Sequence, residues 1–157
     1  WRMGFAVGNE ILIAALEKIK SYLDYGAFTP IQVAAASALS SDPSTIEKVR
    51  GIYRKRRDVL VDAMGKAGWE IPSPDATMFA WAPIPEKFKP LGSLEFSKVL
   101  LKEASISVAP GIGFGEYGEN FVRIGLVENE HRIRQAARNI KSVFNKANKI
   151  LSNYSLD

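Results

Sequence analysis

The sequence has 157 residues, 46% of them hydrophobic and 24% charged, and this ordinary globular composition excludes a wholly disordered chain. The formal net charge of +4 is mild and spread along the chain, so it suits anionic small molecules at least as well as nucleic acid. The absence of cysteine excludes disulfides and thiolate zinc sites, the single histidine, His131, excludes a histidine-rich metal site, and no apolar run approaches the ~20 residues that span a bilayer.

Apolar periodicity and turn residues predict helices and strands in alternation along the chain. They are, in order, a strand at 3–7, helices at 10–23 and 29–39, a long helix from 44 to 67, a strand near 78–81, a helix at 93–104, strands at 106–108 and 121–126, and a final helix after 129. The Ser-Ser-Asp-Pro stretch at 40–43 is the clearest boundary. We therefore predict a compact α+β domain after it, with a small sheet covered by helices on one side.

Local signals mark where these elements begin and end. The residues expected to cap helices at their N-termini are Thr29, Ser44 (in a capping box with Glu47), Ser93 and Asn129. Gly68 is expected to end the long helix. The large aromatic residues Trp69, Phe79 and Trp81 are expected in the core.

Two arginines are candidate anion-binding residues. Arg123 is predicted in mid-strand, on the same face as Phe121 and Gly125. A charged residue in a central strand needs a partner, and either a ligand carboxylate or a structural ion pair with Asp or Glu meets that need. Arg2 precedes an apolar run, where its guanidinium can bind a phosphate or carboxylate or can be an ordinary surface group.

Other polar motifs are less informative. The Gly-rich segment 108–115 (Val-Ala-Pro-Gly-Ile-Gly-Phe-Gly) either brings backbone close to a ligand or is a simple tight connection, and it lacks the Gly-Lys-Ser/Thr of a phosphate loop. The basic run 54–57 wraps most of a helix and is expected to be solvated, as is His131. Paired catalytic carboxylates, Ser-His-Asp sets and metal-ligand spacings are not apparent.

Motifs distributed over the whole chain resemble the class I/II (fold-type I) pyridoxal-phosphate-dependent aminotransferases. They are Trp-Arg-Met-Gly-Phe at 1–5, the segments 19–22, 25–35, 53–58, 67–69, 78–81 and 92–96, the Pro-Gly-Ile-Gly-Phe-Gly loop at 110–115, and Val-Arg at 122–123. The segment 25–30 and the loop 110–115 look most similar to the bacterial glutamate–pyruvate (alanine) aminotransferase group, which is itself similar to LL-diaminopimelate aminotransferases. The resemblance implies a C-terminal fragment of an enzyme of amino acid metabolism and biosynthesis.

The resemblance also implies roles for individual residues. Arg2 would bind the phosphate of pyridoxal 5'-phosphate, and Arg123 would bind the α-carboxylate of the substrate. Tyr25 and Phe28 would contact substrate from a loop near the active site of the other subunit of a homodimer. Residues 1–40 would be a remnant of the large cofactor-binding domain, and 41–157 would be the aminotransferase C-terminal small domain.

Parts of the catalytic machinery are expected outside this sequence. The resemblance places the Schiff-base lysine just before Trp1, and no lysine in the chain stands in its context. We therefore assign no catalytic residue and no metal, and we expect the 157-residue chain alone to be inactive and to bind the cofactor weakly or not at all. The parent enzyme would transfer an amino group between an L-amino acid, alanine or similar, and a 2-oxo acid such as 2-oxoglutarate, in the cytoplasm, without nucleic acid or membrane partners.

Several alternatives remain open at the level of sequence. The parent could be an aspartate or LL-diaminopimelate aminotransferase, because every amino donor presents the same α-carboxylate to Arg123. An aminotransferase-like ligand-binding module of a transcription regulator would share the same motifs. A small nucleic-acid-binding domain would have to rest on the basic run 54–57 and would show salt-dependent binding.

Overall fold

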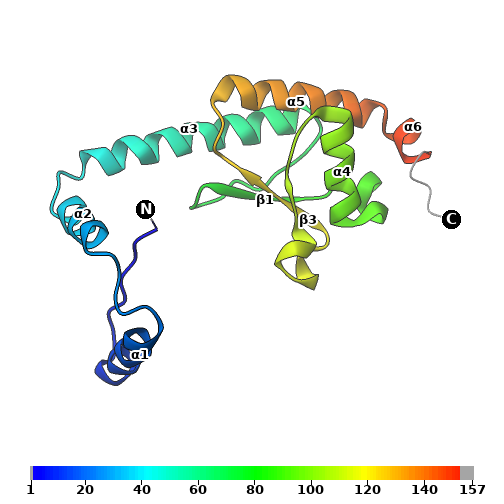
Figure 1. Cartoon of the computed structure of the whole chain (residues 1–157). Helices are drawn as coiled ribbons and strands as arrows, with labels where there is room; N and C mark the ends of the chain where they lie inside the picture. The colour runs from blue at the N-terminus through cyan, green and yellow to red at the C-terminus, as the bar shows by residue number, and fades with distance from the viewer. Residues whose placement is uncertain (1, 153–157) are drawn as a thin grey trace. The chain divides into compact units, whose positions relative to one another are not determined.

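The computed structural model describes residues 2–152 and divides the chain into two compact units, Trp1–Thr45 and Ile46–Asp157 (Figure 1). No helix in the part of the chain that it describes is long and apolar enough to cross a membrane.

The first unit contains two helices, α1 (Glu10–Leu23) and α2 (Thr29–Leu39), and neither has a buried residue. The side chain of Asn9 caps α1 by accepting the N–H groups of Ile11 and Leu12. The prediction of a strand at 3–7 was wrong: these residues are exposed and form no regular element, because no strand in the described residues pairs with them. Thr29 is the first residue of α2 rather than its cap.

The long helix α3 (Ser44–Lys66) differs from the prediction at its start and agrees with it at its end. At its start the expected capping box does not form, because the carboxylate of Asp42 accepts both the N–H and the hydroxyl of Ser44. At its end Gly68 has a φ of +89°, and the N–H of Trp69 donates to the carbonyl of Met64 at 2.9 Å. This left-handed turn confirms Gly68 as the residue that ends the helix.

The second unit contains a three-stranded antiparallel sheet in the order β1-β3-β2, from β1 (Phe79–Pro83), β3 (Phe121–Gly125) and β2 (Ala109–Pro110). Trp81 pairs with Arg123 in the register of β1 and β3. The predicted strand at 106–108 was wrong in position, since pairing begins only at Ala109. The N–H of Ile106 instead donates to Leu100 at the end of the preceding helix, after a left-handed Ser105.

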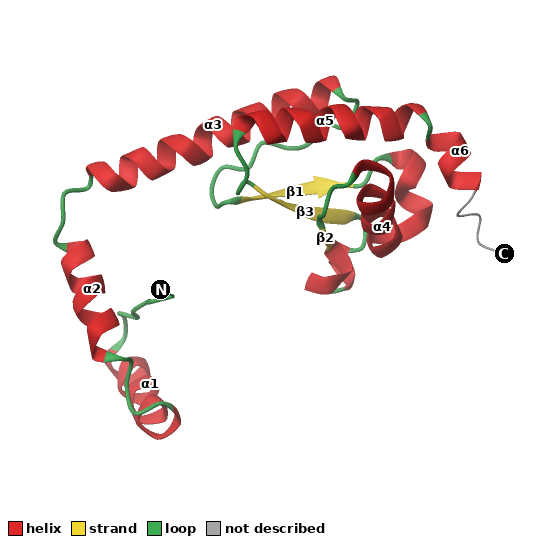
Figure 2. Cartoon of the chain, turned by 45° about the horizontal axis from the view of Figure 1, so that its top comes forward, coloured by secondary structure: helices red, strands yellow, loops and turns green. Residues whose placement is uncertain are grey.

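Helices cover one face of this sheet, as predicted. In Figures 1 and 2, α3 runs side by side with α5 (Glu130–Asn145), and α4 (Gly92–Ala104) packs near the strands. The remaining pieces are the short helix α6 (Ala147–Ser152) and three 3-10 turns, η1 (Glu86–Leu91), η2 (Gly111–Phe114) and η3 (Glu116–Gly118). Asn129 caps α5 as expected, accepting the N–H groups of His131 and Arg132.

The core lies between the sheet and these helices. It includes Ala80, Ala82 and Val122 from the strands, Leu60 and Met64 from α3, Phe96 and Leu100 from α4, and Ile133, Ala137, Ile140 and Val143 from α5. Trp69 is in this core, where its ring meets Phe96 and Phe144 edge to face and its N–H donates to the carbonyl of Pro83 at 2.7 Å.

The prediction that Phe79 and Trp81 are core residues was wrong. Strand alternation turns Ala80 and Ala82 toward the helices and therefore turns Phe79 and Trp81 to the opposite face of the sheet. Trp81 is 38% exposed there. The open face of the sheet thus carries aromatic side chains, and it is the face on which Arg123 lies.

Candidate functional site

Arg123 is flanked by two aromatic rings on the open face of the sheet. The central carbon of its guanidinium lies 4.2 Å from the centre of the Phe79 ring and 4.4 Å from the centre of the Phe114 ring. Both distances are well inside the ~6 Å limit for cation–π attraction. The side chain is half-buried, so the arginine is neither loose in solvent nor enclosed in the core.

Among the described residues, Arg123 does not form the structural ion pair with Asp or Glu that the sequence left open. Within residues 2–152, no carboxylate lies at salt-bridge distance from this guanidinium, and no hydrogen bond joins its N–H groups to another described residue. Contact with ring faces uses the flat surface of the guanidinium, whereas its N–H donors point outward in the plane. Arg123 therefore presents a donor fork that matches the two oxygens of a carboxylate.

A strained turn places the Phe79 ring. Thr77 has a φ of +71°, an unfavourable conformation for a β-branched residue. Its hydroxyl accepts the N–H of Phe79 at 3.1 Å and donates to the Phe79 carbonyl at 3.3 Å. Opposite Phe79 in the register stands Gly125, whose missing side chain leaves the ring room to extend over β3 toward Arg123.

The Gly-rich segment places the Phe114 ring, through the turns η2 and η3. The backbones of Gly111 and Gly118 touch, and a Cβ atom on either would overlap the backbone of the other. This segment is therefore more than a simple connection, because its glycines allow a close approach that fixes the loop carrying Phe114.

Ser93 and Glu119 attach the same loop to helix α4. The Glu119 carboxylate accepts the backbone N–H of Ser93 at 3.1 Å and its hydroxyl at 2.9 Å, while the Ser93 hydroxyl accepts the N–H of Ile112 at 3.0 Å. Ser93 is fully buried in the first turn of α4. The prediction that Ser93 caps this helix was wrong, because a carboxylate 26 residues away satisfies the helix N-terminus instead.

Trp81 extends the aromatic surface beside the arginine. Its ring stacks on Phe121 with centroids 5.5 Å apart and meets Phe114 edge to face at 5.6 Å. Phe114 is 53% exposed. A ligand whose carboxylate reached Arg123 would therefore have a partly apolar wall next to it.

The other predicted site residues belong to the first unit. Arg2 is exposed, with a φ of +60°, and has no ion pair with any residue of the described range 2–152. Tyr25 is 92% exposed and Phe28 is 70% exposed. Their roles at the site remain predictions.

Asp24 holds the turn that carries Tyr25. A hydrogen bond from the Lys20 ammonium, together with one from the N–H of Gly26, lowers the pKa of the Asp24 carboxyl. Two residues of the turn have a positive φ, Tyr25 at +53° and Gly26 at +103°.

Arg56 has a structural role that the sequence did not indicate. One terminal nitrogen of its guanidinium donates to the carbonyls of Leu126 and Val127 at 3.0 and 3.1 Å, which ties α3 to the turn after β3. The basic run 54–57 is therefore only partly solvated, since Arg56 and Arg57 are half-buried while Arg54 and Lys55 are exposed. His131 is exposed, as predicted.

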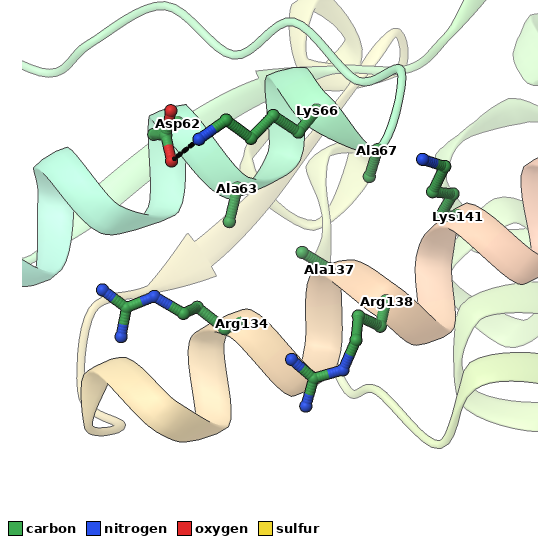
Figure 3. Close-up of a pocket in the computed structure, with 8 residues that line it drawn as sticks. All are labelled: Asp62, Ala63, Lys66, Ala67, Arg134, Ala137, Arg138 and Lys141. Carbon is green, nitrogen blue, oxygen red and sulfur yellow. Dashed lines mark hydrogen bonds and ion pairs between the residues drawn. The ribbon is translucent and has the colours of Figure 1, made fainter.

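A second cationic surface lies in the groove between α3 and α5, shown in Figure 3. Its floor is made of Ala63, Ala67 and Ala137. The Lys66 ammonium is paired with Asp62 at 2.8 Å, and the guanidinium groups of Arg134 and Arg138 point in different directions. The cations do not converge on one point, so this groove lacks the focused geometry of the Arg123 site. No cluster of three potential metal ligands occurs within residues 2–152.

Comparison with known proteins agrees with the motifs. Residues 1–140 match the family described as aminotransferase class I and II. The chain belongs to the class I and II aminotransferases. Its relatives include the putative aminotransferase AatC of Rhizobium meliloti, 68% identical over 98% of this chain, and the glutamate-pyruvate aminotransferase AlaC of Escherichia coli, 54% identical over 92%.

Solved aminotransferase-family structures have the same fold. Substrate-bound BacF from Bacillus subtilis matches 91% of this chain with a TM-score of 0.84 and 38% identity. The aromatic aminotransferase of Pyrococcus horikoshii matches 93% with a TM-score of 0.84 and 29% identity. This chain spans 38% of AatC, 35% of AlaC and 36% of the BacF chain, so it corresponds to about a third of each relative.

Proposed function

We propose that this chain is the C-terminal, substrate-binding part of an aminotransferase that transfers an amino group between an L-amino acid, alanine or similar, and a 2-oxo acid such as 2-oxoglutarate. The observation that carries the proposal is the unpaired donor fork of Arg123 between Phe79 and Phe114. The similarity to AlaC, a glutamate-pyruvate aminotransferase, supports this substrate class.

Arg123 would act by fixing the carboxylate that both substrates share. An amino acid and its 2-oxo acid differ at the α-carbon but carry the same α-carboxylate, so one arginine can hold either of them in turn. A bidentate contact sets the position and the rotation of the carboxylate. This orientation holds the α-carbon in a defined place for the proton transfers of the reaction, and such positioning contributes much of an enzyme's rate.

Pyridoxal 5'-phosphate would supply the electron-withdrawing ring when bound to the longer protein. Arg2 fits its phosphate, because an exposed guanidinium without an ion pair in residues 2–152 can bind a dianion through its N–H donors. Tyr25 and Phe28 are exposed aromatic residues that would contact substrate across the interface of a cytoplasmic homodimer. Residues 1–40 would belong to the large cofactor-binding domain and 41–157 to the C-terminal small domain.

A donor panel on the full-length protein that contains this chain tests the proposal. The protein, loaded with pyridoxal 5'-phosphate, is mixed with 2-oxoglutarate and each of L-alanine, L-aspartate, L-phenylalanine and LL-diaminopimelate, and glutamate formation is measured. We expect turnover with alanine. The Arg123→Lys variant, which keeps the charge but loses the planar fork, should turn over at least tenfold more slowly. Absence of glutamate with every donor would refute the proposal.

A further inference from the structure

We propose that Phe114 and Phe79 are positioning residues that hold the guanidinium of Arg123 flat and turn its N–H donors toward the substrate carboxylate, so that substrate affinity depends on two aromatic rings that do not touch the substrate's carboxylate. This inference rests on the proposed function and adds two residues to its site.

Phe79 and Phe114 both contact the guanidinium of Arg123, and we call this pair of rings the clamp. Phe79 reaches it from β1, at the diagonal position of the strand register, and Phe114 reaches it from η2. No ring contact joins Phe79 to Phe114 among the described residues, although Phe114 does contact Trp81. Each ring contacts the guanidinium on its own, and two such contacts would restrict its rotation without using any of its N–H donors.

A clamp of this kind strengthens carboxylate binding in two ways. An arginine side chain loses much rotational freedom when it forms a fixed contact, and an arginine already held between rings loses less on binding. The rings also remove water from the guanidinium, and a charge pair with less water around it attracts more strongly. Both effects act on the affinity for any ligand with a carboxylate.

The surrounding structure keeps each ring in place independently of ligand. Phe79 follows the strained Thr77 turn, whose hydroxyl bonds the Phe79 backbone. Phe114 belongs to a loop that the Gly111–Gly118 contact closes on itself and that the Ser93–Ile112 hydrogen bond attaches to α4. A strained residue and a close glycine pair are costly features, and both here lead to rings on the same arginine.

Phe114 is the better residue to substitute, because it is 53% exposed and the loss of its ring should leave the core intact. Phe114→Leu removes the ring, and Phe114→Tyr restores a ring of nearly the same shape. Tyr117→Leu is a matched control, since Tyr117 lies in the same loop, is 91% exposed and contacts no other ring among residues 2–152.

The experiment combines binding, kinetics and a spectroscopic signature. In the full-length protein, the Kd of 2-oxoglutarate is measured by calorimetry, and KM and kcat are measured for alanine. In the 157-residue chain, NMR signals of the Arg123 side chain report the ring-current shift of a group lying over aromatic rings.

We expect Phe114→Leu to raise the Kd and the KM about tenfold with a smaller effect on kcat, and to remove part of the ring-current shift. Phe114→Tyr should restore all of these quantities, and Tyr117→Leu should match the wild type. If the wild type transaminates but Phe114→Leu leaves the Kd, the KM and the Arg123 shift unchanged, the positioning role of the rings is refuted and the proposed function stands. If the wild type neither transaminates nor binds 2-oxoglutarate, the proposed function is refuted together with it.

Discussion

Replacing Glu119 by alanine should destabilise the second unit, because this carboxylate satisfies the N-terminus of α4. The substitution removes two hydrogen bonds, to the backbone N–H of Ser93 at 3.1 Å and to its hydroxyl at 2.9 Å. Hydrogen bonds to charged groups contribute roughly 1.5–3 kcal/mol, and loss of a helix N-cap costs roughly 0.5–2 kcal/mol. Because these overlap in one half-buried carboxylate, we expect a loss of about 2–3 kcal/mol in the free energy of unfolding.

Urea denaturation of the 157-residue chain, followed by tryptophan fluorescence, to which the buried Trp69 contributes, measures this loss. With a denaturant slope of about 2 kcal/mol/M, the midpoint should fall by about 1–1.5 M. Glu116→Ala is the matched control, since Glu116 lies in the same loop, is exposed, and makes no side-chain bond with the residues that the structure describes.

A double-mutant cycle separates the Glu119 contact from general effects on the loop. Ser93→Ala and Glu119→Ala act on the same network, so the double variant should lose clearly less stability than the two single losses added together. If Glu119→Ala unfolds at the same urea midpoint as Glu116→Ala, the hydrogen bonds from Ser93 to Glu119 do not stabilise the second unit. The argument that Glu119 caps α4 is then refuted.

Three further perturbations test other contacts of the fold. Arg56→Met leaves the carbonyls of Leu126 and Val127 without their donor and should cost about 1–3 kcal/mol in urea denaturation, whereas Arg54→Met at an exposed position should be near neutral. Gly111→Ala places a Cβ against the Gly118 backbone and should cost about 1–3 kcal/mol, while Gly113→Ala, with open space around it, should not; equal midpoints would contradict the close approach. Because the hydrogen bond from Lys20 and that from Gly26 lower the pKa of Asp24, the turn after α1 gains stability above the pKa of an unfolded aspartate, about 3.9, and loses it as the pH falls through the lower folded pKa. The Gly26 amide shift in NMR should follow this acid transition and should lose it in Asp24→Asn.

Local sequence signals predicted the elements whose boundaries depend on neighbouring residues. Asn129 marks a helix start because its side chain bonds N–H groups two and three residues ahead, and Gly68 marks a helix end because it takes a positive φ. Ser93 failed as a predicted cap for the opposite reason. Its partner, Glu119, comes from a loop that approaches α4 only in the folded chain.

At the candidate site too, the sequence predicted the local features and missed those that depend on the whole fold. The sequence placed Arg123 in mid-strand beside Phe121 and Gly125, which strand alternation requires. It did not predict aromatic partners in place of a carboxylate, because Phe114 comes from a separate loop and because Phe79 was assigned to the core. Which face of the sheet the helices cover is a property of the whole fold, and it decides where Phe79 and Trp81 lie.

The roles of residues in the first unit came from family resemblance alone. Arg2, Tyr25 and Phe28 are exposed, and their neighbours within the described chain give them no distinctive environment. The motif around each residue indicates the family, and the family match over residues 1–140 confirms that membership. Their chemistry at the site remains a prediction that requires the full-length protein.

The proposed carboxylate-binding role of Arg123 can be tested by comparing an amino donor that has a carboxylate with one that lacks it. In the full-length protein, Arg123→Gln should lower kcat/KM for alanine by about 10²–10³, because truncating one partner of a hydrogen-bonded charge pair costs roughly 2–5 kcal/mol. The much slower reaction of ethylamine, which has no carboxylate, should change less than threefold. An equal loss with both donors, or an unchanged kcat/KM for alanine, would contradict the assignment of Arg123 as the residue that holds the substrate.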